Sequence, residues 1–397
     1  MSAGRSILYT LPLLPVWVVI GLALVLGIVS VASARARAVF LRQRLGDRAA
    51  DGECPPATVI VPVKGKDEFL AANLASLAAL DYPDFELIVV AREARDLPEG
   101  VVPPGARVVI AGEGDAMTGE KITNLLAAVD AARTESAVLA FADSDSEVKA
   151  GWLRSLVAAL RGPAVGAATG FRFHLPDSGR FWALLRSVWN SVALGSFGSG
   201  DNAFCWGGAM AIRRDLFEQA RVREYWRGAV SDDYQMSRAV HDAGWKIAFA
   251  PGALVADRSD TGGREFLGWI ARQMILTRVH QPRLWCVGLA AHVIYCAAMV
   301  AAASVEPLLL LTQIALGMAG GAFRLGAARA AFPEYGAWFA RHGSVHALWT
   351  PVATWVWLYS FLASARTNTI HWRGVRYGLA GGGRVTKVER ERTGGAG

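Results

Sequence analysis

The chain has 397 residues, 53% of them hydrophobic, and a formal net charge of +7. A mean hydropathy of +0.29 is high for a wholly soluble protein, so part of the chain is expected to lie in a membrane. The positive charge gathers beside apolar segments and near the C-terminus, which favours anionic lipid headgroups as partners. The sequence contains no nucleic-acid-binding motif, and we expect no nucleic acid as a partner.

The cysteines exclude a disulfide-stapled or zinc-ribbon protein. Cys54, Cys205, Cys286 and Cys296 show neither CxxC nor Cys/His metal spacing, and two of them fall in an apolar segment. This usage agrees with a reducing compartment.

Residues 11–32 form an uncharged apolar segment. At about 1.5 Å per residue, a helix of this length crosses a hydrocarbon core about 30 Å thick. Ala32-Ser33-Ala34 resembles a signal-peptidase site, but the segment exceeds a signal-peptide core and arginines follow it directly. We therefore predict an uncleaved anchor over 1–34 and a basic linker over 35–56. The positive-inside rule puts the next domain on the cytoplasmic side of a bacterial-type inner or cell membrane.

Residues 57–262 are predicted to form an α/β domain, because β-rich runs alternate with helical patterns. The predicted strands are 57–63, 85–91, 106–110 and 137–142, and the predicted helices are 67–80, 119–133 and 149–161. The alternation predicts a largely parallel sheet covered on both faces. Such sheets bind ligands beyond the carboxyl ends of their strands, so the site is expected in the loops that follow them.

Two acidic pairs are candidates for chemistry. Asp143 and Asp145 directly follow the fourth predicted strand, where they can hold a hard divalent cation that also binds phosphate oxygens. The alternative for this pair is an Asx-type turn. Asp232 and Asp233 precede a predicted helix, where they can be an N-cap and a first-turn acid. Alternatively, Asp233 is a general base.

Two lysines are candidates for phosphate binding. Lys121 opens the predicted helix 119–133, and a cation beside a helix N-terminus suits a phosphate. Lys64 follows the first predicted strand and can approach a nucleotide. The alternatives are a solvated surface lysine for Lys121 and a polar turn for Lys64.

Residues 263–284 mix apolar side chains with Arg264, Arg272 and Arg278. This mixture is typical of an amphipathic helix that lies in the headgroup layer. Residues 366–397 are rich in arginine and lysine, which predicts a basic cytoplasmic tail.

Residues 285–365 hold three further apolar segments, 285–304, 307–323 and 347–364. They predict two to three C-terminal transmembrane helices in addition to the N-terminal one. Three crossings would put the basic tail outside, so one segment is expected to be re-entrant or interfacial. The segment that contains Pro351 is the candidate.

Six stretches carry a family resemblance by their order and spacing: ATVIVPVKGKDEFLAANLASLAALDYPDFELIVV, GEKITNLLAAV, FADSDSEV, FCWGGAMAIRRDLFE, VSDDYQMSRAVHDAGWKIAFAP and, in the tail, HWRGVRYGLAGGGRV. They resemble the GT-A glycosyltransferases of family 2 and, within them, the ceramide glucosyltransferase-like branch, family 21. The resemblance covers about residues 57–281 and resumes in the tail. It implies a GT-A, Rossmann-like α/β domain that uses a nucleotide-sugar donor.

The resemblance also implies roles for individual residues. Asp143 and Asp145 match the acidic motif that holds the donor diphosphate through Mn²⁺ or Mg²⁺, and Asp233 matches the general base, with Asp232 beside it. The contact to the nucleotide base is expected after the second strand, where Glu93 is the first choice and Asp96 the second. The donor-binding residues so implied are Lys64, Glu93, Asp96, Lys121, Asp143, Gly207 and Gly208.

Family members carry Gln/Arg-x-x-Arg-Trp on the acceptor side of the site, and this chain departs from that pattern. Arg272 and Gln273 keep the leading polar positions, but neither register restores the Arg-Trp pair, and Ile275 and Leu276 stand in its place. Arg278, about one helical turn further on, is the candidate for the missing charge. The altered pair argues against ceramide itself as the acceptor.

The expected function is that of a membrane-bound, inverting, metal-dependent glycosyltransferase. It would move a sugar from UDP-glucose or a related UDP-hexose to the hydroxyl of a ceramide-like or other membrane lipid in the bilayer. The alternatives are a processive polysaccharide synthase, a hopanoid- or prenyl-lipid glycosyltransferase, and an inactive scaffold for envelope assembly. The sequence does not indicate an oligomeric state.

Overall fold

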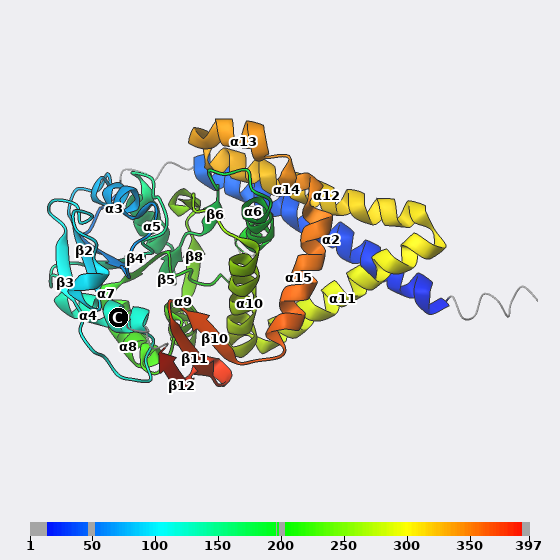
Figure 1. The fold of residues 1–397 in the computed structure, drawn as a ribbon. Coiled ribbons are helices and arrows are strands. Elements are labelled where there is room, and N and C mark those ends of the chain that lie inside the picture. Colours follow the sequence, from blue (N-terminus) through cyan, green and yellow to red (C-terminus); the bar gives the residue numbers. More distant parts are fainter. Residues whose placement is uncertain (1–13, 47–51, 196, 198–202, 391–397) are drawn as a thin grey trace, which may run out of the picture.

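The computed structural model describes residues 14–46, 52–195, 197 and 203–390. Three long helices project together from one side of an α/β domain (Figure 1). They are α2 (Leu14–Gly46), α11 (Pro282–Val305) and α12 (Pro307–Ala331). Within the described residues, these are the three helices long and apolar enough to cross a membrane, which confirms one N-terminal and two C-terminal candidate spans.

The domain is built on a seven-stranded sheet with the order β3-β2-β1-β4-β7-β5-β8. Only β7 runs antiparallel to its neighbours, so the predicted, largely parallel α/β sheet is confirmed. Its strands are β1 (Ala57–Pro62), β2 (Phe85–Ala91), β3 (Arg107–Ile110), β4 (Val138–Ala142), β5 (Val165–Thr169), β7 (Ala209–Arg213) and β8 (Lys246–Phe249). The short strands β6 (Arg172–His174) and β9 (Val255–Asp257) form a separate parallel pair.

Helices cover both faces of the sheet, because alternate strand residues point to opposite sides. Val59 and Val61 of β1 are buried against α3 and α5, whereas Ile60 is buried on the opposite face against α4 and α9. The covering helices are α3 (Leu70–Ala78) and α5 (Trp152–Leu160) on one face, and α4 (Glu120–Ala131), α7 (Arg214–Gln219), α8 (Val222–Trp226) and α9 (Asp232–Asp242) on the other.

The strand order reverses between β1 and β4, which pair directly although β2 and β3 intervene in the chain. Such a switch point leaves a crevice at the carboxyl ends of the two strands. Lys64 follows β1, and Asp143 and Asp145 follow β4. The topology therefore brings these three predicted residues to one place.

Helix α10 (Gly263–His280) differs from the sequence-based expectation. Residues 263–284 were predicted to lay their apolar side chains in the headgroup layer, but Phe266, Ile270 and Met274 are buried in protein. They pack against α6 (Phe181–Leu194) and α15 (Thr350–Ser364). Helical periodicity correctly identified the apolar face, but not what covers it.

The basic tail is also more structured than predicted. Its residues form the antiparallel sheet β10 (Thr369–Trp372), β11 (Val375–Leu379) and β12 (Val385–Arg390). Ile370, Tyr377 and Leu379 of this C-terminal sheet are buried against Ile275 and Val279 of α10. The alternation of these apolar residues with charged ones is a strand pattern.

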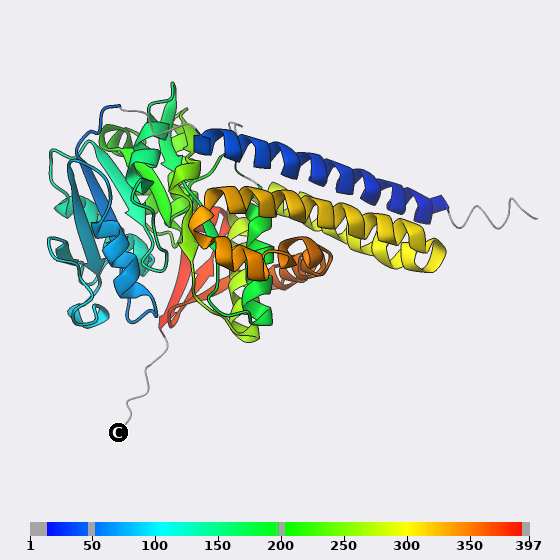
Figure 2. The same ribbon diagram turned by 90° about the horizontal axis from the view of Figure 1, so that it is seen from above.

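Helix α15 runs across the direction of the three long helices in both views (Figures 1 and 2). Its 15 residues extend about 22 Å, which is too short to cross a hydrocarbon core. It begins at the Pro351 segment, so the prediction that this segment does not span agrees with the structure. It is preceded by α13 (Gly336–His342) and α14 (Val345–Leu348).

Candidate active site

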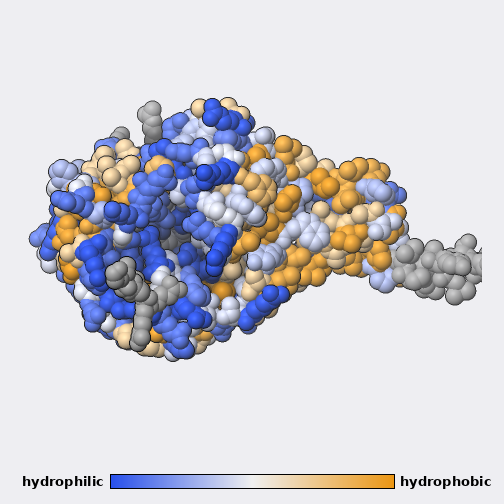
Figure 3. Space-filling view, in the orientation of Figure 1, coloured by the Kyte–Doolittle hydropathy of each residue, from blue (hydrophilic) through white to orange (hydrophobic). Residues whose placement is uncertain are grey.

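A pocket opens at the carboxyl ends of β1 and β4. The face that carries it is hollowed and ringed by hydrophilic residues, whereas the projecting helices are largely hydrophobic (Figure 3). The pocket is lined by residues from the sheet loops, α4, α9, α10 and the C-terminal sheet. The predicted residues among its lining are Lys64, Lys121, Asp143, Asp145, Gly207, Asp232, Asp233, Arg272 and Gln273.

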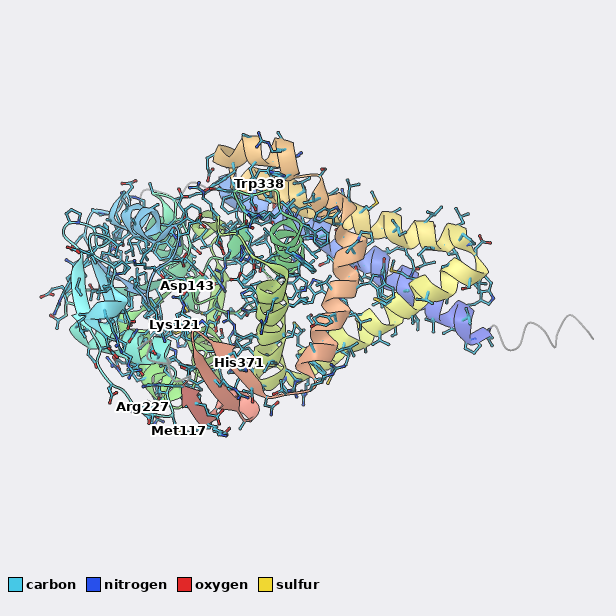
Figure 4. The ribbon with its side chains drawn as sticks, viewed as in Figure 1. Met117, Lys121, Asp143, Arg227, Trp338 and His371 are labelled. Carbon is cyan, nitrogen blue, oxygen red and sulfur yellow. The ribbon has the colours of Figure 1, made fainter. Side chains whose placement is uncertain are left out.

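Lys121 links two of the pocket's carboxylates. It lies in the first turn of α4, close to Asp143 (Figure 4). Its Nζ is 2.8 Å from Oδ1 of Asp143 and 3.0 Å from Oδ2 of Asp232. Burial alone would lower the pKa of Lys121, but the two carboxylates outweigh burial and raise it above its ordinary value. The lysine is therefore charged at neutral pH.

Asp143 and Asp145 are each held by a cation. Burial alone would raise the pKa of Asp143, but Lys121 and Arg172 hold it below its ordinary value, so this carboxylate is ionised at neutral pH. Oδ2 of Asp145 accepts a hydrogen bond from Nη1 of Arg172 at 2.9 Å. The same nitrogen lies 3.2 Å from Oδ2 of the buried Asp257. Arg172 thus fixes Asp145 against the β6–β9 pair.

Asp232 and Asp233 form the first turn of α9, and Ser231, not Asp232, is the N-cap residue. Burial and the charge of Asp233 raise the pKa of Asp232 to about 6. Oδ1 of Asp233 accepts hydrogen bonds from the Ser231 hydroxyl and from the backbone N–H of Tyr234 at 2.8 Å. Within the described residues, Oδ2 accepts only a long hydrogen bond of 3.4 Å from the backbone N–H of Gly207. Oδ2 therefore makes fewer and longer hydrogen bonds than Oδ1.

Gly207 allows the lysine and the carboxylates to meet. A Cβ atom at this position would lie 2.6 Å from Oδ2 of Asp232 and 2.9 Å from Nζ of Lys121. Both distances are below van der Waals contact, so a larger residue would push the ion pair apart.

Arg272 and Gln273 reach the pocket from α10. Burial lowers the pKa of Arg272 to about 10, and within the described residues its guanidinium makes no ion pair. Arg272 also lines a second cavity between α10 and β10, as do Arg186, Arg264, Arg376 and His371. The two cavities therefore share a cationic wall.

Four predicted residues lie outside the pocket lining. Glu93 is paired with Arg95 at 2.7 Å, and the Asp96 carboxylate accepts from the backbone N–H of Glu93 at 3.3 Å. Arg278 was expected to supply the missing charge, but it points away and donates to the Thr367 carbonyl at 2.8 Å. The fourth, Gly208, lies beneath the ring of Trp206, which does line the pocket.

The pocket also contains residues that the sequence did not single out. They include Arg172 and Trp206 from the domain and Trp372, Arg373 and Tyr377 from the C-terminal sheet. Trp372, Arg373 and Tyr377 lie in the tail stretch HWRGVRYGLAGGGRV, so the family resemblance of this stretch is a sequence signal for them. Arg172 carries no local signal, because it reaches the pocket only through the packing of β6 beside the sheet.

The carboxylates fit a metal shared with a ligand. In the described part of the chain, no three His, Cys, Asp or Glu side chains are grouped to hold a metal. Mg²⁺ does not require such a group, because it is usually bound through one or two carboxylates, waters and substrate phosphates. Asp143 and Asp145 both face the pocket, with side chains 23% and 31% exposed, and fit this type of site.

An α/β domain with paired carboxylates at a strand switch point is typical of an enzyme that uses a nucleotide-linked substrate. The sequence model of Glycosyl transferase family 21 matches residues 16–385, so the chain belongs to this family and is a glycosyltransferase. This confirms the family resemblance, and the observed sheet agrees with the GT-A type of fold that it implied.

Solved glycosyltransferases share a distant similarity with the chain. One is the mannosyltransferase PcManGT from Pyrobaculum calidifontis in complex with GDP-Man and Mn²⁺, at 18% identity, with coverage of 87% of this chain and 98% of that one and a TM-score of 0.45. Another is glucosyl-3-phosphoglycerate synthase from Mycobacterium tuberculosis in complex with Mn²⁺ and UDP-glucose. It is 18% identical, with 59% of this chain and 80% of that one covered and a TM-score of 0.35.

Proposed function

We propose that the protein transfers a hexose from a nucleotide diphosphate donor, a UDP-hexose, to a hydroxyl group of a membrane lipid, with inversion at the sugar carbon. The observation that carries the proposal is that Lys121, Asp143 and Asp233, from three separate elements, line one pocket at the strand switch point. That pocket belongs to a glycosyltransferase with three helices able to cross a membrane.

The leaving diphosphate is stabilised by fixed positive charge. Two of the three N–H groups of Lys121 point to Asp143 and Asp232, and the third makes only a long contact of 3.5 Å to the Gly207 carbonyl, which a phosphate oxygen would replace. Asp143 and Asp145 would hold Mn²⁺ or Mg²⁺ together with the donor phosphates, and the metal would neutralise charge on the leaving group. Because these groups are already oriented, they stabilise the developing charge without reorganising.

Asp233 is the general base in this proposal. Its Oδ1 is fixed by Ser231 and the Tyr234 backbone, which orients Oδ2 as the oxygen that takes the proton of the acceptor hydroxyl. No second carboxylate is needed as a nucleophile, so the hydroxyl displaces the diphosphate directly and the anomeric configuration inverts.

Asp233→Asn tests this assignment. The amide cannot accept the proton, so transfer is expected to fall by at least about a hundredfold, while donor affinity, measured by calorimetry in detergent, changes little. Asp242→Asn, at the exposed end of the same helix, is the control and should transfer normally. Near-normal turnover by Asp233→Asn would rule out its role as the base.

Product analysis separates this proposal from the other functions. Lipids from cells that overexpress the protein should contain a new glycolipid by mass spectrometry. A polymer in place of a glycolipid would favour a polysaccharide synthase. An absence of donor turnover with Mn²⁺ or Mg²⁺ would favour a scaffold.

The acceptor is proposed to reach the pocket from the membrane through the second cavity, which shares Arg272 and Ile370 with the first. The arginines that line this cavity suit a headgroup rich in oxygen acceptors. Helix α15 packs against α10, which lines this cavity. The exposed apolar side chains of α15 form a stripe, which we call the α15 stripe: Val352, Trp355, Tyr359 and Leu362. Their helical spacing supports a position for α15 in the interface, beside the acceptor.

A further inference from the structure

The tip of the β10–β11 hairpin adopts a costly backbone conformation. Trp372 pairs with Val375, so only Arg373 and Gly374 form the turn. Their φ angles are +46° and +77°, the left-handed pair for which Asn-Gly is the favoured sequence. An arginine with its Cβ pays a steric cost there that asparagine or glycine largely avoids. Residues held in such conformations cluster at functional sites.

This tip reaches into the candidate active site. Arg373 donates a hydrogen bond from Nη1 to the carbonyl of Lys64, the second residue after the end of β1. Trp372 and Arg373 both line the pocket, together with Arg272 and Leu276 of α10. The contact spans more than 300 residues of sequence, so it exists only because the C-terminal sheet folds back onto the domain.

The pocket's cations differ in how far they are already neutralised. Lys121 is paired with Asp143 and Asp232, and Arg172 with Asp145 and Asp257. Lys64 is paired with Glu120 at 2.9 Å. Among the described residues that line the pocket, only Arg272 and Arg373 lack a close carboxylate.

The nearest carboxylate to Arg373 is Asp67, whose Oδ2 is 4.0 Å from Nη2. Arg373, Arg272 and Asp143 line the same pocket. A negatively charged ligand in this pocket would therefore meet both Arg373 and Arg272. On α10 itself, the positions where the sequence analysis expected an arginine and a tryptophan hold Ile275, buried under the sheet, and Leu276.

We propose that Arg373 is a ligand of the donor diphosphate, so that the C-terminal hairpin completes the donor site. The proposal rests on the proposed function, because it takes a nucleoside diphosphate as the occupant of the pocket. In this arrangement Arg373 exchanges its long contact with Asp67 for charge-assisted hydrogen bonds to phosphate oxygens. Trp372 lines the pocket beside Arg373.

Arg373→Asn separates binding from folding, because asparagine suits this turn better than arginine. We expect the variant to melt at the wild-type temperature or above it, in detergent. Its Kd for UDP or GDP, measured by calorimetry with Mn²⁺, should rise by about tenfold to a hundredfold, as for the loss of a hydrogen bond to a charged group. Arg373→Lys should keep more of the affinity. Lys387→Asn, which removes an exposed charge from the same sheet, should bind like wild type.

Three results would overturn the assignment. Arg373→Asn could bind UDP and GDP as tightly as wild type, which would remove Arg373 from the donor site and leave the proposed function intact. Arg373→Lys and Arg373→Asn could lose affinity equally, which would show that the charge is not what binds. Wild-type protein that binds neither diphosphate would refute the proposed function as well.

Discussion

At the residue scale, the site depends on one buried lysine, Lys121, that forms ion pairs with two carboxylates. The side chains of Lys121 and Asp232 are only 12% and 6% exposed, so each charge needs the other. The removal of one partner from such a buried pair leaves an uncompensated charge. The chemistry of the pocket and the stability of the domain are therefore coupled at Lys121.

Lys121→Met should lower the free energy of unfolding by about 3–5 kcal/mol and abolish transfer. The double variant Lys121→Met/Asp232→Asn should regain part of that stability but no activity, because one of the two carboxylates that lost the lysine is now neutral while the phosphate ligand is still missing. Denaturation curves in detergent and a transfer assay measure the two effects. Equal stability of the single and double variants would contradict the ion-pair account.

At the element scale, α9, α10 and the C-terminal sheet meet around one histidine. His280, at the end of α10, stacks on Tyr234 of α9 with ring centroids 4.5 Å apart. Its ring also faces Gly383, where a Cβ atom would lie 2.0 Å from it. Tyr234 is further tied to α10 by a 2.9 Å hydrogen bond between its hydroxyl and that of Thr277. These contacts hold the C-terminal sheet against the α/β domain.

This histidine predicts a pH dependence of stability. Burial lowers the pKa of His280 from 6.5 to about 4. Between these values the unfolded chain binds the proton and the folded chain does not, so stability is complete above about pH 6.5 and falls as the pH drops towards 4. The loss is on the order of 3 kcal/mol. His280→Phe keeps the stacking but cannot titrate, so the melting temperatures of variant and wild type should diverge only in this range. Parallel curves would refute the assignment.

At the scale of the whole molecule, the C-terminal sheet fixes the topology. The backbone N–H of Val385 donates to the Gly228 carbonyl at 2.8 Å, and Gln235 donates to the Gly382 carbonyl at 2.8 Å. The sheet and the catalytic domain must therefore lie on the same side of the membrane. Two spans, α11 and α12, lie between them, and an even number of crossings satisfies this condition. A third crossing by α15 would not.

We predict that a C-terminal tag and Cys54 of the catalytic domain lie on the cytoplasmic side, and that an N-terminal tag lies on the opposite side. The arginines that follow the N-terminal span support this orientation. Impermeant thiol labelling and protease digestion of sealed inside-out vesicles measure it. Protection of the C-terminal tag in vesicles that expose the catalytic domain would contradict a two-span C-terminal region.

Much of the domain follows from local sequence patterns. The four predicted strands occur in the sheet, and three of them, β1, β2 and β4, are recognisable because buried parallel strands are short apolar runs that need no distant information. Asp143, Lys121 and Asp233 could be selected because they follow a strand or open a helix, and α/β topology gathers such positions at one edge. The membrane spans follow from length and hydropathy alone.

Only the tertiary structure decided which partners meet across long distances. Periodicity identified the apolar face of α10, but whether lipid or protein covers that face depends on where α6, α15 and the C-terminal sheet pack. Arg278 and Arg373 are equally charged in the sequence, yet packing turns the first away from the pocket and brings the second into it. Local propensity carries no information about contacts between residues hundreds of positions apart, so the chain by itself determined the first four strands, the candidate spans and the acidic motifs, and the fold determined which arginines face the site.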